Sequence, residues 1–313
     1  MSGGRGSGRP PGEAPEDLDA LTTESSGELG PQLEAMSTPE LVRLVGEGDA
    51  RVADAVATQR EAIAAAVDAI AERMARGGRL LHVGAGTSGR LGVLDASEVP
   101  PTFGTPPGLV VGIVAGGPAA LVEAVEAAED DPAAGAAALD EAGAGPLDSV
   151  VGIAASGRTP FVLGALERAG QLGCLRVGLS CNAATPVSAR SDVAIEVVVG
   201  PEVVRGSTRL RAGTATKLVL NTLSTLVMVR LGKTYGSLMV DVRATNAKLQ
   251  QRALRIVATA TGAADEQARA ALAAADGHAG TAVAMLRLGV DAPAARAALE
   301  RAGGSLARAL GEL

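Results

Sequence analysis

The sequence predicts an α/β fold, a doubly wound and mostly parallel sheet of five strands flanked by helices. From residue 79 onward, short runs of almost uninterrupted apolar residues alternate with stretches long enough for helices. Such runs indicate strands that are covered on both faces, as in a parallel sheet, because half-exposed strands alternate apolar with polar residues. The expected strands are Leu80–Val83, Leu109–Ala115, Val150–Ile153, Leu175–Leu179 and Val193–Val198.

Helices are expected between and around these strands. Pro118–Glu129 and Thr159–Leu172 have helical length and connect successive strands, as a doubly wound sheet requires. Apolar residues from Pro39 to Arg76 recur at helical spacing and predict two or three helices before the sheet. Leu218–Leu231 is expected to be a buried core helix, because polar and charged residues interrupt or flank it and leave it too short for a bilayer.

The chain divides into three parts. Residues 1–20 combine Gly, Pro and Arg without periodicity or an apolar segment, which predicts a disordered leader and not a signal peptide. Residues 21–245 hold the α/β domain and the helices that precede it. Residues 246–313 are rich in Ala and punctuated by Gly, so we expect Ala268–Leu286 and Ala294–Leu310 to be amphipathic helices of a small three-helix unit.

Composition excludes several classes of function. Aromatic residues make up 1% of the 313 residues, too few for modules that stack bases on rings. The net charge of −7 gives no reason to expect nucleic acid or an anionic membrane as a partner. Two Cys and two His are too few for a Cys/His zinc site, so we expect no metal and a reducing cytoplasm.

A glycine loop follows the first expected strand. Gly84–Gly89 has the G-x-G-x-x-G spacing at a strand-to-helix turn, where backbone amides and a helix N-terminus bind anions. Dinucleotide binding also needs an acidic residue about twenty positions further on, and none occurs from Pro100 to Val122. The loop therefore favours phosphate over NAD, the alternative being a tight turn that only lets the helix approach the sheet.

A second loop of hydroxyls and glycine, Ala154–Pro160, follows the third expected strand. Taken alone, it is explained by helix capping through Ser156 or Thr159. Two such loops at the carboxyl ends of strands in one sheet instead predict a site for a small phosphorylated molecule, because open α/β sheets bind ligands at that edge. Gly206–Thr214 adds hydroxyls and cations at another helix start, although its arginines are equally compatible with solvated surface residues.

Carboxylates are the remaining candidates for acid and base. His82 lies within a strand and His278 in the distant tail, so a Ser-His-Asp triad is not expected, and Cys174 and Cys181 are expected to be inert apolar filler. Clustered carboxylates repel, which raises the pKa of one member and prepares an acid and a base, although solvated helix ends explain the same clusters. The two clusters are Asp95 with Glu98, and Glu126 with Glu129, Asp130 and Asp131.

The segment Leu81–Gly104 closely resembles N-acetylmuramic acid 6-phosphate etherases. So do Gly152–Pro160, Gly178–Asn182 and Leu238–Asn246, and the similarity runs from about Leu21 to the C-terminus. The resemblance implies a sugar isomerase (SIS) fold, a C-terminal unit like a ubiquitin-associated domain, and a homodimer. It also implies cleavage of the D-lactyl ether of N-acetylmuramate 6-phosphate in cell-wall amino-sugar recycling, without a cofactor.

The resemblance also assigns residues. The two catalytic glutamates of the family match Glu98, expected to be the acid, and Glu129, expected to be the base. By analogy with sugar isomerase folds, the sugar phosphate is expected to bind at Gly86, Thr87, Ser88, Ser156, Gly157 and Thr159.

Some positions depart from the family pattern, and other functions on this fold stay open. Gly48 stands where Glu is common, Val99 where Cys is frequent, and Arg211 where Lys is usual. An aldose-ketose isomerase would use a similar base but would not need Glu98. A non-catalytic sugar-phosphate regulator is a further alternative, although such proteins tend to carry two SIS domains and this chain has room for one.

Overall fold

The computed structural model describes residues 21–25, 33–123, 125–241 and 247–313. The expected leader, residues 1–20, and the expected domain boundary at residues 245 and 246 lie outside the described residues.

Five parallel strands form one sheet in the order β2-β1-β3-β4-β5. This confirms the predicted parallel, doubly wound sheet, and the strand ends differ from the predicted ones by at most two residues. In the register, Leu80 lies opposite both Val110 and Ser149, so the first residues of three strands are aligned. The strands are β1 (Leu80–Gly84), β2 (Val110–Val114), β3 (Ser149–Ile153), β4 (Leu175–Ser180) and β5 (Val193–Glu196).

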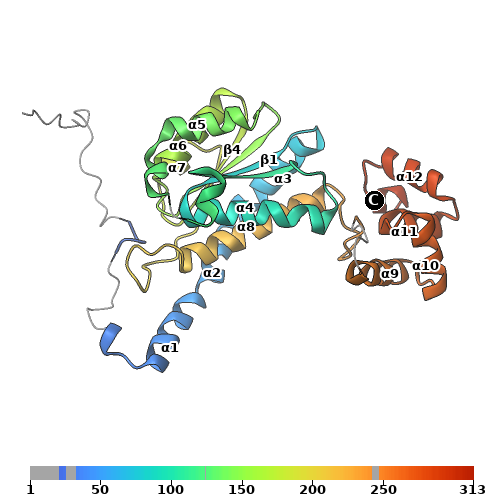
Figure 1. The fold of residues 1–313 in the computed structure, drawn as a ribbon, viewed down its shortest axis with the longest axis horizontal. Helices are drawn as coiled ribbons and strands as arrows, with labels where there is room; N and C mark the ends of the chain where they lie inside the picture. Colours follow the sequence, from blue (N-terminus) through green and yellow to red (C-terminus); the bar gives the residue numbers. More distant parts are fainter. Residues whose placement is uncertain (1–20, 26–32, 124, 242–246) are drawn as a thin grey trace, which may run out of the picture.

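Helices cover both faces of the sheet (Figure 1). One layer contains α3 (Arg60–Ala75), α4 (Gly86–Phe103) and α8 (Arg211–Arg230), whose buried residues share an apolar core with β3, β4 and β5. The other layer contains α5 (Pro132–Glu141), α6 (Pro160–Gln171) and α7 (Pro186–Ala189), which bury the opposite face of β1 and β3. The sheet thus lies between two helical layers with separate cores.

From residue 33 to the first strand, the structure has three α-helices, as the spacing of apolar residues predicts. They are α1 (Thr38–Asp49), α2 (Val52–Ala57) and α3. Figure 1 shows α1 standing away from the sheet, and Val42 on this helix is 67% exposed. A short 3₁₀ turn, η2 (Leu33–Ala35), comes before it.

The predicted core helix is α8, which begins seven residues earlier than expected. It is the one helix in the described part of the chain that is long and apolar enough to cross a membrane. Ala212, Val219, Leu223 and Val227 are fully buried against α3 and α4, so the apolar composition of α8 serves the core of the domain.

The prediction of a helix over Pro118–Glu129 is wrong. The segment holds two 3₁₀ turns, η3 (Gly117–Leu121) and η4 (Glu126–Asp130), and the helix that crosses back to β3 is α5. Gly116 and Gly117 have positive φ, which ends the strand in a turn, while Val122 and Val125 stay exposed. Asp131 is the N-cap residue of α5, and its carboxylate accepts a 3.0 Å hydrogen bond from the amide of Ala134.

The C-terminal region is helical, but its helices are shorter than predicted. Asp276 and Gly277 have positive φ and divide the expected helix Ala268–Leu286. Gly303 and Gly304 likewise divide Ala294–Leu310. The helices are α9 (Ala247–Thr261), α10 (Asp265–Ala274), α11 (Ala279–Leu288), α12 (Ala292–Arg301) and α13 (Leu306–Ala309), which share a core of their own.

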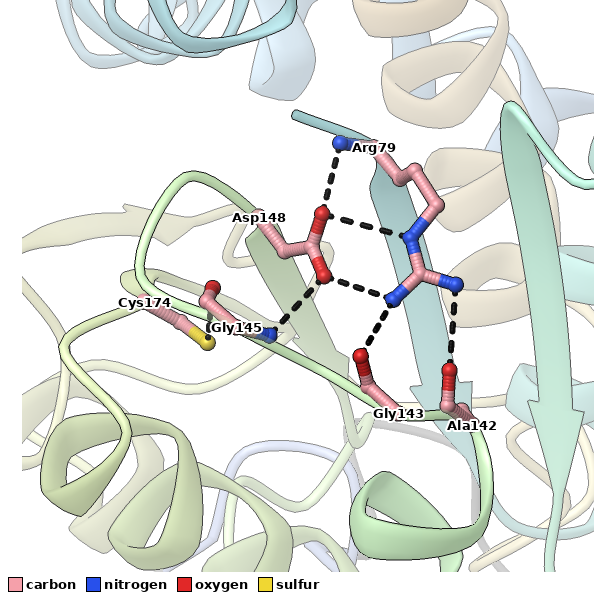
Figure 2. A network of polar contacts seen from close by, with 6 residues as sticks. All are labelled: Arg79, Ala142, Gly143, Gly145, Asp148 and Cys174. Carbon is pink, nitrogen blue, oxygen red and sulfur yellow. Dashed lines mark hydrogen bonds and ion pairs between the residues drawn. The ribbon is translucent and has the colours of Figure 1, made fainter. Parts of the chain in front are cut away.

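A polar clamp fixes the amino-terminal edge of the sheet (Figure 2). The backbone amide and guanidinium of Arg79 donate to Asp148, at 2.7 Å from the amide and 2.7 Å from Nη2. The guanidinium also donates to the carbonyls of Ala142 and Gly143 at the end of α5. Since β1 follows Arg79 and β3 follows Asp148, the clamp holds the two central strands in register.

Candidate active site

The carboxyl ends of β1 and β3 form the switch point of the sheet. The chain leaves β1 toward β2 on one side and later reaches β3 on the other side, so the loops that follow β1 and β3 diverge. Open α/β sheets bind ligands in the crevice that such diverging loops leave. The two loops singled out in the sequence are the ones that diverge at this switch point.

The glycines of the first loop have different roles. A Cβ on Gly84 would lie 2.7 Å from the amide nitrogen of Gly89, and a Cβ on Gly89 would lie 2.6 Å from the carbonyl oxygen of Gly84. These two glycines therefore let α4 approach β1 closely. Gly86 instead has a φ of +51° and faces open space, so the close approach of helix and strand does not explain it.

The start of α4 has hydrogen-bond donors that are not used within the described part of the protein. Its N-cap residue, Ala85, supplies no side-chain cap. The half-buried hydroxyls of Thr87 and Ser88 have no hydrogen-bond partner among the described residues. Free amides and hydroxyls at the positive end of a helix dipole are suited to bind an anion such as phosphate.

The second loop places Ser156, Gly157 and Thr159 before α6. Gly157 has a φ of +70°, and a Cβ there would lie 2.3 Å from the Cβ of Thr185, so glycine is required on both counts. Thr159 is the N-cap residue of α6, yet its side chain makes no capping hydrogen bond. Ser156 accepts a 3.3 Å hydrogen bond from the amide of Arg158. Capping therefore does not account for Thr159, whose hydroxyl is available to a ligand.

Asn182, which follows β4, ties three segments together at this edge. Its side-chain oxygen accepts hydrogen bonds of 2.8 Å from both the amide and the hydroxyl of Thr22. Its amide nitrogen donates to Thr23 and, at 3.0 Å, to the carbonyl of Ala155 in the second loop. Sequence reasoning missed this role, because contacts between residues about 160 positions apart leave no local pattern.

The third polar segment does not offer an open anion site. The buried carboxylate of Glu202 accepts 3.0 Å hydrogen bonds from the amides of Arg211 and Ala212 and thereby occupies the start of α8. The guanidinium of Arg211 donates to the carbonyl of Pro201 at 2.7 Å. A Cβ on Gly213 would lie 3.6 Å from the methyl group of Thr87, so the first turns of α4 and α8 adjoin.

Glu98 lies in α4, and its carboxylate is 61% exposed. Its Oε2 forms an ion pair with Nζ of Lys217 on α8 at 3.2 Å. Twelve residues separate Glu98 from Gly86, which corresponds to about 18 Å along the helix axis. Glu98 is therefore far along α4 from the open N-terminal turn of that helix.

Glu129 lies in η4 and is exposed, and its neighbour Ala128 packs on the core beneath α5 and α6. By contrast, Val99, the neighbour of Glu98, is buried in the core on the other face of the sheet. The segments that carry the two glutamates thus pack in opposite helical layers of the chain. The side chain of Glu126, in the same cluster, is not described.

Asp95, predicted as a partner of Glu98, is buried and 3% exposed, so it is not a solvated helix end. Its carboxylate joins His82 Nε2 at 3.0 Å and the hydroxyl of Ser224 at 2.9 Å. The aspartate stands between the histidine and the serine, which is not the order of a catalytic triad. This network links β1, α4 and α8 within the core.

The cysteines are buried, as predicted. Burial raises the pKa of Cys181 to about 12 and also raises the pKa of Cys174, which keeps both thiols protonated and unreactive. In the described part of the chain, no group of three or more His, Cys, Asp and Glu side chains is arranged to hold a metal ion.

Comparison with known proteins places this geometry in a class. Residues 62–170 match the family model described as the glucokinase regulatory protein N-terminal SIS domain. Among solved structures, a phosphoheptose isomerase from Francisella tularensis matches with a TM-score of 0.50 and 20% identity, over 62% of this chain and 100% of that one. The fold is the SIS fold, and the switch point of its sheet is the candidate site.

Two curated relatives match almost end to end. An N-acetylmuramic acid 6-phosphate etherase from Rubrobacter xylanophilus is 57% identical over 95% of this chain and 98% of its own length. One from Streptomyces avermitilis is 55% identical over 94% of each chain. The chain belongs to the N-acetylmuramic acid 6-phosphate etherase family, as the resemblance in its motifs predicts.

Proposed function

We propose that this protein cleaves the D-lactyl ether of N-acetylmuramic acid 6-phosphate, giving N-acetylglucosamine 6-phosphate and D-lactate in cell-wall amino-sugar recycling. The observation that carries the proposal is identity above 50% to etherases over almost the whole chain. The open helix starts at the switch point support it, since they suit a small phosphorylated ligand. Gly86, Thr87, Ser88, Ser156, Gly157 and Thr159 are the proposed ligands of the sugar phosphate.

The chemistry needs one carboxylate as a base and one carboxylic acid. Opening of the sugar ring exposes an aldehyde at C1, which makes the C2 proton acidic. In our proposal Glu129 takes that proton, the C2–H electron pair forms a C2=C3 double bond, and the C3–O bond breaks. Glu98 gives its proton to the departing lactyl oxygen. A positioned acid or base typically contributes about 10²–10⁴-fold in rate.

Water then completes the reaction and restores both residues. Its oxygen adds to C3 of the unsaturated aldehyde, and Glu98 takes one of its protons. Glu129 returns its proton to C2. The net change is the addition of one water across the ether bond, so no redox cofactor is needed.

A homodimer is part of this proposal, because one chain holds Glu98 and Glu129 in opposite layers. The surface around Glu98 also exposes Leu94, Leu218 and Leu226 at 37 to 42%. We propose that this surface packs on a second copy of the chain. Each site then takes Glu98 from one chain, and Glu129 and the two loops from the other. In a twofold dimer this arrangement creates two equivalent sites.

A reducing cytoplasm is the proposed location, since both cysteines are free and buried. The net charge of −7 supports a small-molecule partner and argues against nucleic acid or an anionic membrane surface as a partner.

Release of D-lactate from N-acetylmuramic acid 6-phosphate, measured in the presence of a chelator, tests the function. Wild type is expected to release lactate, and Glu98→Gln and Glu129→Gln are each expected to lose at least about 100-fold in rate while staying folded. Binding without lactate release by wild type would refute the etherase and favour a sugar-phosphate regulator. Full activity of Glu98→Gln would refute the role of Glu98 as acid.

A further inference from the structure

Lys217 is the cation that the structure places beside Glu98. Its side chain is 28% exposed and reaches from α8 to the carboxylate on α4, where the ion pair measures 3.2 Å. The start of α8 adjoins the start of α4, where Gly213 faces Thr87. Lys217 therefore stands on a helix that contacts both the open start of α4 and Glu98.

The proposed substrate makes this cation significant, and the inference rests on the proposed function. The lactyl carboxylate is bonded to the same carbon as the ether oxygen that Glu98 protonates. A carboxylate so close to the ether oxygen must also lie close to Glu98. Once Glu98 has given up its proton, it and the lactyl carboxylate are two anions at short distance, which repel strongly unless a cation stands between them.

We propose that Lys217 binds the lactyl carboxylate and so determines the specificity of the enzyme for lactyl ethers. An ammonium group has three donors, so it can hold Glu98 and a second carboxylate at once. N-acetylglucosamine 6-phosphate lacks the carboxylate, which leaves this contact unmade in the product complex. Lys217 thus distinguishes substrate from product by charge.

The 6-phosphate is the alternative partner for Lys217, because Lys217 lies about one helical turn beyond Gly213, which adjoins Thr87. The phosphate is assigned to the loops after β1 and β3, whereas Glu98 lies about 18 Å along α4 from the first turn of that helix. In the proposed dimer, the loops of one chain hold the phosphate. The lactyl group then faces Glu98 and Lys217 of the other chain.

The test compares two substrates that differ only at the carboxylate. One is N-acetylmuramic acid 6-phosphate, and the other is its lactamide, in which a neutral amide replaces the carboxylate. Lys217→Met is expected to lower kcat/KM about 10- to 100-fold with the acid and less than about threefold with the amide, since a charge-assisted hydrogen bond is lost with the acid alone. Lys217→Arg is expected to keep the preference of wild type for the acid.

Arg230→Met is the matched control, because it removes another cation of α8, one that pairs with Asp68 at an exposed site. Arg230→Met is expected to leave kcat/KM unchanged with both substrates. An equal loss by Lys217→Met with both substrates would overturn the proposal and assign Lys217 a structural role. If wild type releases lactate, and Lys217→Met has the same ratio of kcat/KM for the acid to kcat/KM for the amide as wild type, this proposal alone fails. If wild type releases none, the proposed function fails with it.

Discussion

At the scale of single residues, two departures from the family pattern meet in space. Gly48 lies in α1 where family members commonly have Glu, and Arg211 begins α8 where Lys is usual. A Cβ on Gly48 would lie 1.8 Å from Nη2 of Arg211, so the glycine makes room for the larger guanidinium. Gly48 and Arg211 are therefore neighbours in space, which the sequence alone does not reveal because 163 positions separate them.

Gly48→Ala is therefore expected to lower the free energy of unfolding by about 1 to 2 kcal/mol, because the guanidinium must leave its hydrogen bond with Pro201. Gly46→Ala on the same helix meets nothing within 4 Å and is expected to stabilise by about 0.5 to 1 kcal/mol. Urea unfolding measures both. In an Arg211→Ala background Gly48→Ala should also stabilise, and equal effects of the two alanines in wild type would contradict this account.

Asp148 links stability to pH. Burial raises the pKa of its carboxyl, but the hydrogen bonds from Arg79 and from the amide of Gly145 outweigh burial, and the net pKa is lowered. A lowered folded-state pKa gives stability that is present above the unfolded pKa, near 4, and is lost as the pH falls through the folded pKa.

Asp148→Asn is accordingly expected to lower the free energy of unfolding by about 2 kcal/mol at pH 7, and by less as the pH falls toward 3. Unfolding midpoints across that range measure the difference from wild type. Asp140→Asn is the control, since its ion pair with Arg168 is half exposed and contributes about 1 kcal/mol or less. If the difference in unfolding free energy between Asp148→Asn and wild type does not change with pH, the lowered pKa of Asp148 is not the source of this stability.

At the scale of elements, the strands are predictable from sequence and the connections are less so. Buried parallel strands leave continuous apolar runs, and each predicted strand is present. The segment from Gly117 to Asp130 is not predictable in the same way, because its Ala content suits a helix while Gly116 and Gly117 start a turn. In the C-terminal region, glycines with positive φ determine where helices end. The spacing of apolar residues does not show which glycines adopt that conformation.

The hydrogen bonds of Asn182 to Thr22, Thr23 and Ala155, which we call the tether, connect residues 21–25 to the second loop of the site. Asn182→Asp removes the donor to Ala155 and places a carboxylate oxygen against that carbonyl, which displaces the second loop. We expect KM for the sugar phosphate to rise about tenfold and amide exchange at residues 21–25 to accelerate. Ser180→Ala, which loses only a hydroxyl bond to the backbone of Asn182, is the control and should change KM less than threefold. Unchanged exchange at residues 21–25 in Asn182→Asp would contradict the role of the tether.

At the scale of the whole molecule, the sequence locates both glutamates and both loops but not their separation. Each motif is local, and the doubly wound order of the strands sends α4 and α5 to opposite faces of the sheet. The relation between Glu98 and Glu129 therefore depends on topology, which places one glutamate in each layer. In the proposed dimer, a second chain therefore supplies the other glutamate of each site.

Subunit complementation tests this shared site. If each site takes Glu98 from one chain and Glu129 from the other, Glu98→Gln and Glu129→Gln form inactive homodimers. A heterodimer of the two variants carries one site with both glutamates and one with neither. After subunits exchange at equal amounts, about half of the dimers are mixed and activity should reach about a quarter of wild type. If exchange is verified with tagged chains and activity stays at the level of the single variants, both glutamates act within one chain.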